Sequence, residues 1–318
     1  MRITNNIISN NYLSALNKSL ERQSQIQEQL ADGKAVHRPS DDPIKTIRSL
    51  RFNTNLAMNE QFTQTVNDSQ SWMNTTDGAM SNLSSIMIRI KELAISADGS
   101  KPADALNTIG AEIDQLINQA ITIGNSKVGD RYVFSGQADK IMPFERKTIT
   151  DANGISQDVV VYHGDLNKIS MLIKPGVVTP AKDAININGE ELFGPITSTP
   201  AGEKTLDIFS QLIAIKEALQ KSQPDTNYVS TTGLKNIEDA HAAQLKQHTQ
   251  LGARMSAYEM AKSMLENNNT IIIGDVAANE DLDFAKAIID QQTSENIYKA
   301  ALAVGAKIMP PSLVDFLR

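Results

Sequence analysis

Cysteine is absent from this chain of 318 residues. Its absence excludes disulfides, thiolate zinc sites, iron–sulfur clusters and a cysteine nucleophile. Aromatic residues are also scarce, at 5% with a single Trp, whereas hydrophobic residues make up 41% of the chain. This composition is sufficient to bury a core, but it is poor material for a compact sandwich or barrel. It favours long helices packed through Leu, Ile and Ala.

The sequence also lacks a long apolar run and an excess of basic charge. The longest aliphatic cluster, Ile271–Ile273, is far shorter than the ~18 apolar residues of a membrane span. The first residues do not lead into the apolar core of a signal peptide. The net charge of −7 argues against general binding to nucleic acid or to an anionic membrane. We therefore expect neither partner, and either a cytosolic protein or one exported without a cleaved signal.

Helical spacing predicts three helices in the N-terminal part of the chain. A weakly apolar stripe, interrupted by Gln23 and Gln27, indicates a helix over residues 3–31. A turn precedes a long helix over residues 43–97, and a third helix follows over residues 106–123 as an antiparallel hairpin. The first stripe consists of Leu13, Leu16, Leu20 and Leu30. The turn consists of Arg38, Pro39, Ser40, Asp41, Asp42 and Pro43.

A period of two replaces the helical period after residue 130, so residues 131–202 predict a small β-rich insert. The strongest hairpin signal is the Asn-Gly turn within residues 151–154. Strand-like residues occur over 131–136, 159–162, 169–173 and 184–187.

Helical spacing returns from residue 203 to the C-terminus. It predicts helices over residues 203–219, 228–267 and 281–307, the first of which is ended by Pro224. The last helix carries a heptad seam with polar gaps at Gln291 and Glu295. The apolar members of that seam are Phe284, Ile288, Tyr298, Leu302 and Met309.

These elements predict a mainly α, elongated fold in which paired terminal helices continue into a long helical bundle or rod, with the β insert in mid-chain. We expect residues 1–40 and 280–318 to form a terminal assembly domain. Residues 41–130 and 203–279 would form the rod, and residues 131–202 an exposed insert. Residues 1–51 hold eight basic and five acidic side chains (net +3), and residues 268–318 hold four basic and seven acidic ones (net −3). Opposite charge favours pairing of the two ends.

The search for catalytic chemistry finds little. There is no phosphate-binding glycine loop, no nucleophile elbow and no zinc-protease helix. Glu238 and His241 have the Glu-x-x-His spacing of di-iron helices, but that site requires a second such motif and two further glutamates. His248 lies two helical turns from His241, about 10 Å along the axis, which is too far for one metal. We therefore interpret both histidines as polar residues of a helical bundle.

Two other patterns have a structural interpretation. Asp41 and Asp42 form an acidic pair, but their position before Pro43 is typical of turn and cap residues rather than of acid–base catalysis. Met73, Met80 and Met87 follow each other at intervals of seven, which predicts a core stripe rather than a promiscuous groove. No cofactor, metal or enzymatic activity is expected.

The end helices are long, but their seams are partly polar. A lone helix with so few apolar residues is marginal in water. Such ends become stable if they pack against copies of themselves, so we expect folding of the ends to be coupled to assembly.

Several short motifs at the two ends resemble the flagellin family. At the N-terminal end they are residues 2–5 (RITN), 30–34 (LADGK) and 38–43 (RPSDDP). At the C-terminal end they are residues 251–254 (LGAR), 298–302 (YKAAL) and 312–317 (SLVDFL). Residues 131–136 (RYVFSG), 143–144 (PF) and 162–165 (YHGD) are similar to those of family members that join the flagellar hook to the filament. Ile44 and Lys45 replace the small residues usual in filament flagellins, which also favours the junction type.

The resemblance implies a structural protein of the extracellular bacterial flagellum. It implies that copies form a ring between hook and filament and adapt one helical lattice to the other. It implies export unfolded through the flagellar type III channel and a cytoplasmic export chaperone at the C-terminal helix. Its other neighbours would be a hook-associated protein on the hook side and flagellin on the other. Pro310 and Pro311 predict a break in the terminal helix.

The predicted subunit contacts lie in the terminal helices. They are Ile3, Ile7, Leu13, Leu16, Leu20, Leu30, Phe284, Ile288, Tyr298, Leu302, Met309, Leu313, Phe316 and Leu317. The main alternative is a short filament flagellin. An alternative of another class is a helical metal enzyme that uses Glu238, His241 and His248, and a non-flagellar coiled-coil scaffold is more remote.

Overall fold

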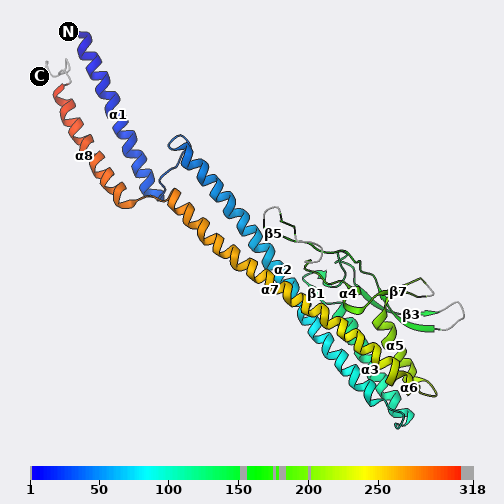
Figure 1. Ribbon diagram of the computed structural model, residues 1–318. Helices are drawn as coiled ribbons and strands as arrows, with labels where there is room; N and C mark the ends of the chain where they lie inside the picture. Colours follow the sequence, from blue (N-terminus) through cyan, green and yellow to red (C-terminus); the bar gives the residue numbers. More distant parts are fainter. Residues whose placement is uncertain (1, 151–155, 175–176, 179–183, 200–201, 309–318) are drawn as a thin grey trace. The chain divides into compact units, whose positions relative to one another are not determined.

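The structure is a computed structural model, and it describes residues 2–150, 156–174, 177–178, 184–199 and 202–308 (Figure 1). These residues form two compact units. The terminal unit comprises residues up to Asn59 and from Asn267, and the central unit comprises Glu60–Glu266. This division has two parts, and the three-part domain division expected from the sequence stays a prediction.

Long helices dominate both units, so the mainly α fold class is confirmed. The principal helices are α1 (Arg2–Asp32), α2 (Pro43–Ser96), α3 (Ala103–Gly124), α5 (Asp207–Gln220), α7 (Leu234–Glu280) and α8 (Phe284–Ile308). Three short ones are α4 (Gly189–Phe193), α6 (Thr226–Tyr228) and the π-helical turn η2 (Val229–Gly233). The helices expected over residues 3–31, 43–97 and 106–123 are confirmed within a few residues. The helix expected over 228–267 begins later and continues to Glu280.

The strands lie in the middle of the chain, as expected. They are β1 (Lys127–Val128), β2 (Arg131–Tyr132), β3 (Phe144–Thr150), β4 (Ser156–Tyr162), β5 (Leu172–Lys174), β6 (Val177–Val178), β7 (Ile196–Ser198) and β8 (Lys204–Leu206). The main sheet is antiparallel with strand order β3-β4-β8-β7. Thr150 pairs with Ser156, so the hairpin is confirmed, although its turn, 151–155, lies outside the described residues.

Two strand predictions are wrong, one for residues 184–187 and one for the residues beyond Tyr132. Residues 184–187 are buried but form no strand. The amide of Asn186 there accepts from the backbone N–H of Ile169 at 2.8 Å and donates to the carbonyl of Asn167 at 3.0 Å. β2 ends at Tyr132, and Gly136, within the residues predicted as strand, adopts a φ of +73°, which is not a strand conformation.

The core of the central unit is built from α2, α3, α5, α7 and the main sheet. Met73, Met80 and Met87 are buried in it, so the predicted core stripe is confirmed. Next to them an aromatic cluster contains Phe144, Tyr162, Phe193 and Phe209, whose successive rings lie 4.6–5.8 Å apart. This cluster joins the strands to α5.

Tyr162 is also a polar link inside this core. Its hydroxyl donates to the carbonyls of Phe134 at 2.9 Å and Asp165 at 3.1 Å, and it accepts from the N–H of Gly189 at 3.1 Å. Burial raises the pKa of this phenol to about 12. The side chain therefore links β4 to Phe134, to Asp165 and to the start of α4 at Gly189 while it stays neutral.

A charge cluster connects the sheet to α3 and α5. Arg146 donates to Asp114 at 2.6 Å and to Asp158 at 2.8 Å. Lys216 lies 3.1 Å from Asp158 and 3.4 Å from Asp114. The hydrogen bond from Arg146 lowers the pKa of Asp158 to about 2.

Acid should remove the contribution of Asp158. Its folded pKa of about 2 lies below the ordinary value of 3.8, so the ionised form stabilises the fold. This stability is complete above the ordinary value and is lost as the pH falls toward the folded pKa. Urea unfolding of the central unit should therefore show a larger loss of stability between pH 5 and pH 2 in the wild type than in Asp158→Asn. Asp130→Asn, which alters an exposed carboxylate, should behave like the wild type.

Removing the Tyr162 hydroxyl should destabilise the central unit. Tyr162→Phe leaves the N–H of Gly189 and the carbonyls of Phe134 and Asp165 short of a partner, at a cost of about 1–3 kcal/mol. Chemical denaturation measures this loss. Tyr132→Phe is the control, because the Tyr132 hydroxyl makes no hydrogen bond within the described part of the chain. Equal stability of the two variants would contradict the role assigned to Tyr162.

Candidate assembly surface of the terminal helices

The terminal helices α1 and α8 lie side by side and run antiparallel (Figure 1). Tyr12, near one end of α1, donates its hydroxyl to the carbonyl of Ala301, near the end of α8, at 2.5 Å. At the other end of the pair, the N–H of Leu282 donates to the carbonyl of Gly33 at 2.9 Å. The sequence expectation that the two ends pair is thus supported by contacts at both ends of the helices.

The seam between α1 and α8 contains many small and polar side chains. The positions that face the partner helix repeat in steps of three and four, and Ile26, Ala287 and Ser294 are the most buried side chains. The α1 positions are Tyr12, Leu16, Ser19, Gln23, Ile26 and Leu30, and the α8 positions are Ala287, Gln291, Ser294, Tyr298, Ala301 and Gly305. This seam uses Leu16, Leu30 and Tyr298 of the predicted contacts.

Gly305 allows the close approach of the two helices. A Cβ atom at this position would lie 2.3 Å from the Tyr12 hydroxyl oxygen and 2.5 Å from its ring. Any larger residue must displace the Tyr12 side chain. Sequence reasoning missed Gly305, since a glycine within a helix has no periodic signal of its own.

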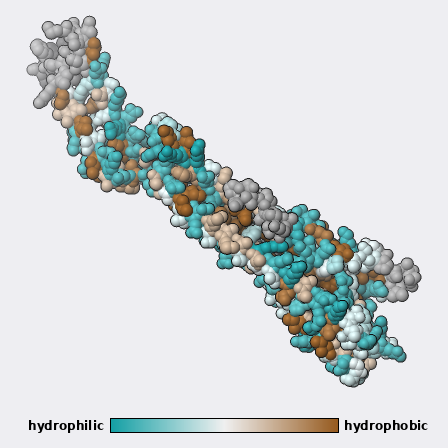
Figure 2. All heavy atoms as spheres, viewed as in Figure 1, coloured by the Kyte–Doolittle hydropathy of each residue, from teal (hydrophilic) through white to brown (hydrophobic). Residues whose placement is uncertain are grey.

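The remaining predicted apolar contacts whose side chains the structure describes are exposed in the single chain. Five of them are between 41% and 52% exposed: Leu13, Leu20, Phe284, Ile288 and Leu302. With about 100° per residue, each of the five lies to the same side of its helix's buried seam in this antiparallel pair. They form what we call the apolar side, and hydrophobic residues reach the surface of the terminal helices in Figure 2.

The other side of the pair is a hollow with charged walls. Lys18 and Arg22 of α1 face Asp290, Thr293 and Ile297 of α8 around a volume of 340 Å³. The α1–α8 pair therefore has the apolar side and, opposite to it, a side with charged residues. Ile7 is exposed away from both sides. The side chain of Ile3 and residues Met309, Leu313, Phe316 and Leu317 lie outside the described residues, as does the break predicted at Pro310–Pro311.

The acidic pair before α2 has a capping role. Asp42 accepts from the N–H groups of Ile44 and Lys45, each at 3.0 Å. Asp41 accepts from the N–H of Arg38 at 3.2 Å, which closes the turn. These contacts agree with the turn-and-cap interpretation of Asp41 and Asp42, and the same role for the whole segment Arg38, Pro39, Ser40, Asp41, Asp42 and Pro43 stays a prediction.

Glu280 holds the segment between α1 and α2 in place. Its backbone carbonyl accepts from the N–H of Ala35 at 2.7 Å, and its side chain accepts from Ser49, from Asn53 at 3.0 Å and from Lys34 at 3.2 Å. The hydrogen bond from Ser49, reinforced by Lys34 and Asn53, lowers the pKa of Glu280. Sequence reasoning missed this residue too, because a single Glu at a helix end has no distinctive spacing.

The middle motifs converge in the central unit. Tyr162 contacts the ring of Phe144 and the carbonyl of Phe134, and the N–H of Asp165 donates to Ser135 at 3.0 Å. These residues come from the three segments that resemble the junction type of the family. They form one packed structural site.

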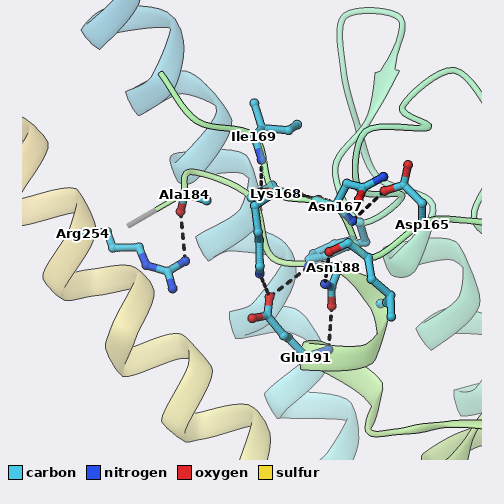
Figure 3. A network of polar contacts seen from close by, with 12 residues as sticks. Asp165, Asn167, Lys168, Ile169, Ala184, Asn188, Glu191 and Arg254 are labelled. Atoms are coloured by element: carbon cyan, nitrogen blue, oxygen red, sulfur yellow. Dashed lines mark hydrogen bonds and ion pairs between the residues drawn. The ribbon is translucent and has the colours of Figure 1, made fainter. Parts of the chain in front are cut away.

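A polar network fixes the loop that leads into α4 (Figure 3). Arg254 of α7 donates to the buried carbonyl of Ala184 at 3.1 Å, and the side chain of Asn188 accepts from Glu191 N–H at 2.9 Å as the α4 cap. Lys168 forms an ion pair with Glu191. Arg254, the last residue of the LGAR motif, thus anchors the insert to α7.

The histidines have protein partners. His241 Nε2 lies 2.9 Å from the Ser84 hydroxyl, and His248 Nε2 lies 2.7 Å from Asp77. Glu238 forms an ion pair with Lys91 at 2.9 Å. Within the described ranges no three His, Asp or Glu side chains are grouped as a metal site, and no helix is long and apolar enough to cross a membrane.

Comparisons with known proteins agree with this architecture. Residues 3–139 match the bacterial flagellin N-terminal helical region. The chain is 23% identical over 275 residues to flagellar hook-associated protein 3 of Escherichia coli (strain K12), covering 83% of each protein. It is 32% identical over 119 residues to flagellin of Salmonella muenchen, but this covers only 36% of the chain and 24% of that flagellin.

Solved structures show the same fold. A putative flagellar hook-associated protein from Vibrio parahaemolyticus aligns with a TM-score of 0.62 at 15% identity, covering 76% of this chain and all of that one. FlgL of Xanthomonas campestris aligns with a TM-score of 0.57 at 17% identity, covering 71% of this chain and 99% of that one.

These findings confirm the resemblance to the flagellin family drawn from the terminal motifs. Flagellin-like proteins of this kind are structural components of the bacterial flagellum and not enzymes, which removes the metal-enzyme alternative. The chain carries the N-terminal helical region of the flagellins, and over most of its length it is similar to flagellar hook-associated protein 3.

Proposed function

We propose that this chain joins the flagellar hook to the filament, and that its copies assemble through the apolar side of the α1–α8 pair. The observation that carries the proposal is the exposure of Leu13, Leu20, Phe284, Ile288 and Leu302 on one side of that pair. Exposed apolar side chains gathered on one side of a helix pair are stabilised by burial against a neighbour.

The extent of the two similarities favours the junction over the filament. The similarity to hook-associated protein 3 spans 83% of this chain, whereas that to flagellin spans 36%. The resemblance further suggests a ring of copies, a hook-associated protein on the hook side and flagellin on the other. Export without a cleaved signal and a chaperone at the C-terminal helix belong to the same proposal.

The proposal predicts an effect of charge on the apolar side. Leu13→Glu/Leu20→Glu should leave the central unit folded, because both side chains are exposed in the single chain. It should lower swimming and filament attachment at least tenfold in cells that lack the wild-type chain, because each charge would be desolvated in the subunit contact. Ser14→Glu/Gln25→Glu is the control, because both side chains are exposed on the face of α1 that is turned away from α8 and from the apolar side.

Labelling locates the chain directly. Antibody against residues 131–202 should mark a single band where hook meets filament in electron micrographs of isolated flagella. Label along the whole filament would mean that the chain is a flagellin.

Normal swimming of the Leu13→Glu/Leu20→Glu variant would show that the apolar side is not the subunit contact.

Coupled folding predicts trypsin-sensitive ends. Few side chains are buried between α1 and α8, so the pair should open in the dilute monomer. Trypsin should then cut at sites such as Arg22, Lys34 and Lys286, and remove much of residues 1–38 and 286–318 while the central unit persists. Mass spectrometry identifies the fragments. Resistance of both ends at low protein concentration would contradict coupled folding.

A further inference from the structure

The first turns of α2 present an unpartnered face in the terminal unit. Thr46, Ser49 and Phe52 lie toward the rest of the unit and are partly buried. Ile44, Ile47 and Leu50 are instead exposed, at 66%, 53% and 63%. Three aliphatic side chains within two helical turns are thus left in solvent.

This face is also strongly basic. Residues 43–59 include Lys45, Arg48 and Arg51 and no acidic residue. Arg48 and Arg51 are exposed, and neither forms an ion pair within the described part of the chain. We call Ile44, Ile47, Arg48, Leu50 and Arg51 the α2 ridge. A partner for it must combine apolar surface with negative charge.

The central unit contains a hollow with these properties. A volume of 530 Å³ opens between α4, the start of α5 and α7. Its lining includes the apolar residues Leu192, Ile208, Pro195, Ala240 and Ala243, and no Lys or Arg is among the described residues that line it. Its acidic residues are Glu190, Glu191, Asp207 and Asp239.

Two of the four carboxylates have hydrogen-bond or ion-pair partners within the chain, and two have no ion-pair partner among the described residues. Glu191 pairs with Lys168 and completes the α4 cap, and Asp207 accepts from Gln211 at 2.6 Å. Glu190 and Asp239 have no ion-pair partner within the described ranges. They therefore leave negative charge at the edge of the hollow that a basic helix would neutralise.

We propose that the α2 ridge of one copy docks in this hollow of a neighbouring copy. The inference rests on the proposed function, since it requires copies to be held together in an assembly. The ridge supplies aliphatic and guanidinium groups. The hollow supplies apolar walls and the carboxylates of Glu190 and Asp239, which have no ion-pair partner within the described part of the chain. Two different surfaces of the same chain meet, so the contact is heterologous, which is the type that repeats into rings and helical arrays.

Chemical cross-linking tests the contact directly, because the chain has no cysteine of its own. Arg51→Cys and Asp239→Cys, made in full-length chains with different tags, are co-expressed in cells lacking the wild-type chain. Flagella are isolated and treated with a short bismaleimide. Each chain then has one thiol, so a product that carries both tags joins two copies. Leu245→Cys, exposed on another face of α7, replaces Asp239→Cys as the control.

The expected result is a doubly tagged product at least tenfold more abundant with Asp239→Cys than with Leu245→Cys. Equal yields, with both tags found where hook meets filament, would overturn the docking while leaving the proposed function intact. Tags found elsewhere would overturn the proposed function and the docking with it. A product linking the Arg51→Cys chain to a different protein instead would assign the ridge to that partner and also overturn the inference.

Charge reversal provides an independent test. Arg48→Glu/Arg51→Glu and Glu190→Lys/Asp239→Lys should each lower filament attachment about tenfold, because each places like charges together. All four changes in one chain should restore attachment to within about threefold of the wild type. Absence of this rescue, when circular dichroism shows all variants folded, would exclude the pairing.

Discussion

The close pairing of α1 with α8 determines which side chains of these two helices are buried and which stay exposed. Gly305 lets the α8 backbone approach Tyr12, and the seam is completed by side chains such as Ala287, Ser294 and Gln23. Small and polar residues bring helices together but bury little apolar surface, so the pair gains little free energy from hydrophobic burial. The larger aliphatic side chains are left outside. This arrangement agrees with the proposal that neighbouring copies cover and stabilise these helices.

The central unit differs from the terminal unit, because its apolar and charged side chains find their partners within the same chain. Its methionine stripe, aromatic cluster and ion pairs are satisfied within one chain, as the contacts of Tyr162 and Arg146 show. A unit of this kind can fold before assembly and present fixed surfaces to its neighbours. In the proposed docking, the α2 ridge of the terminal unit of one copy would contact the acidic hollow in the central unit of another copy.

Polar contacts at helix ends control the chain path between α1 and α2. Asp42 caps α2, and Glu280 receives hydrogen bonds from Ser49, Asn53 and Lys34 while its carbonyl binds Ala35. The arrangement satisfies backbone groups that would otherwise lack partners at helix ends. The hydrogen bonds that Asp42 accepts from Ile44 and Lys45 also favour the start of α2 at Pro43. In the middle of the chain, Arg254 and Asn186 likewise form hydrogen bonds with backbone groups of segments that were expected to be strands, namely the carbonyl of Ala184 and the N–H of Ile169.

The sequence by itself determined the helices, the β insert, the cap at Asp42 and the buried methionine stripe, because each depends on the local period or on turn chemistry. It also carried the terminal motifs that identified the family resemblance. Tertiary structure decided which residues of the end helices face each other: it placed Leu16 and Leu30 in the seam and left Leu13 and Leu20 exposed. Sequence periodicity predicts that apolar residues share one face of a helix, but the position of the partner helix decides which of them are buried. The roles of Glu280 and Gly305 were likewise visible only in the structure, since their partners Asn53 and Tyr12 are more than 200 residues away in the chain.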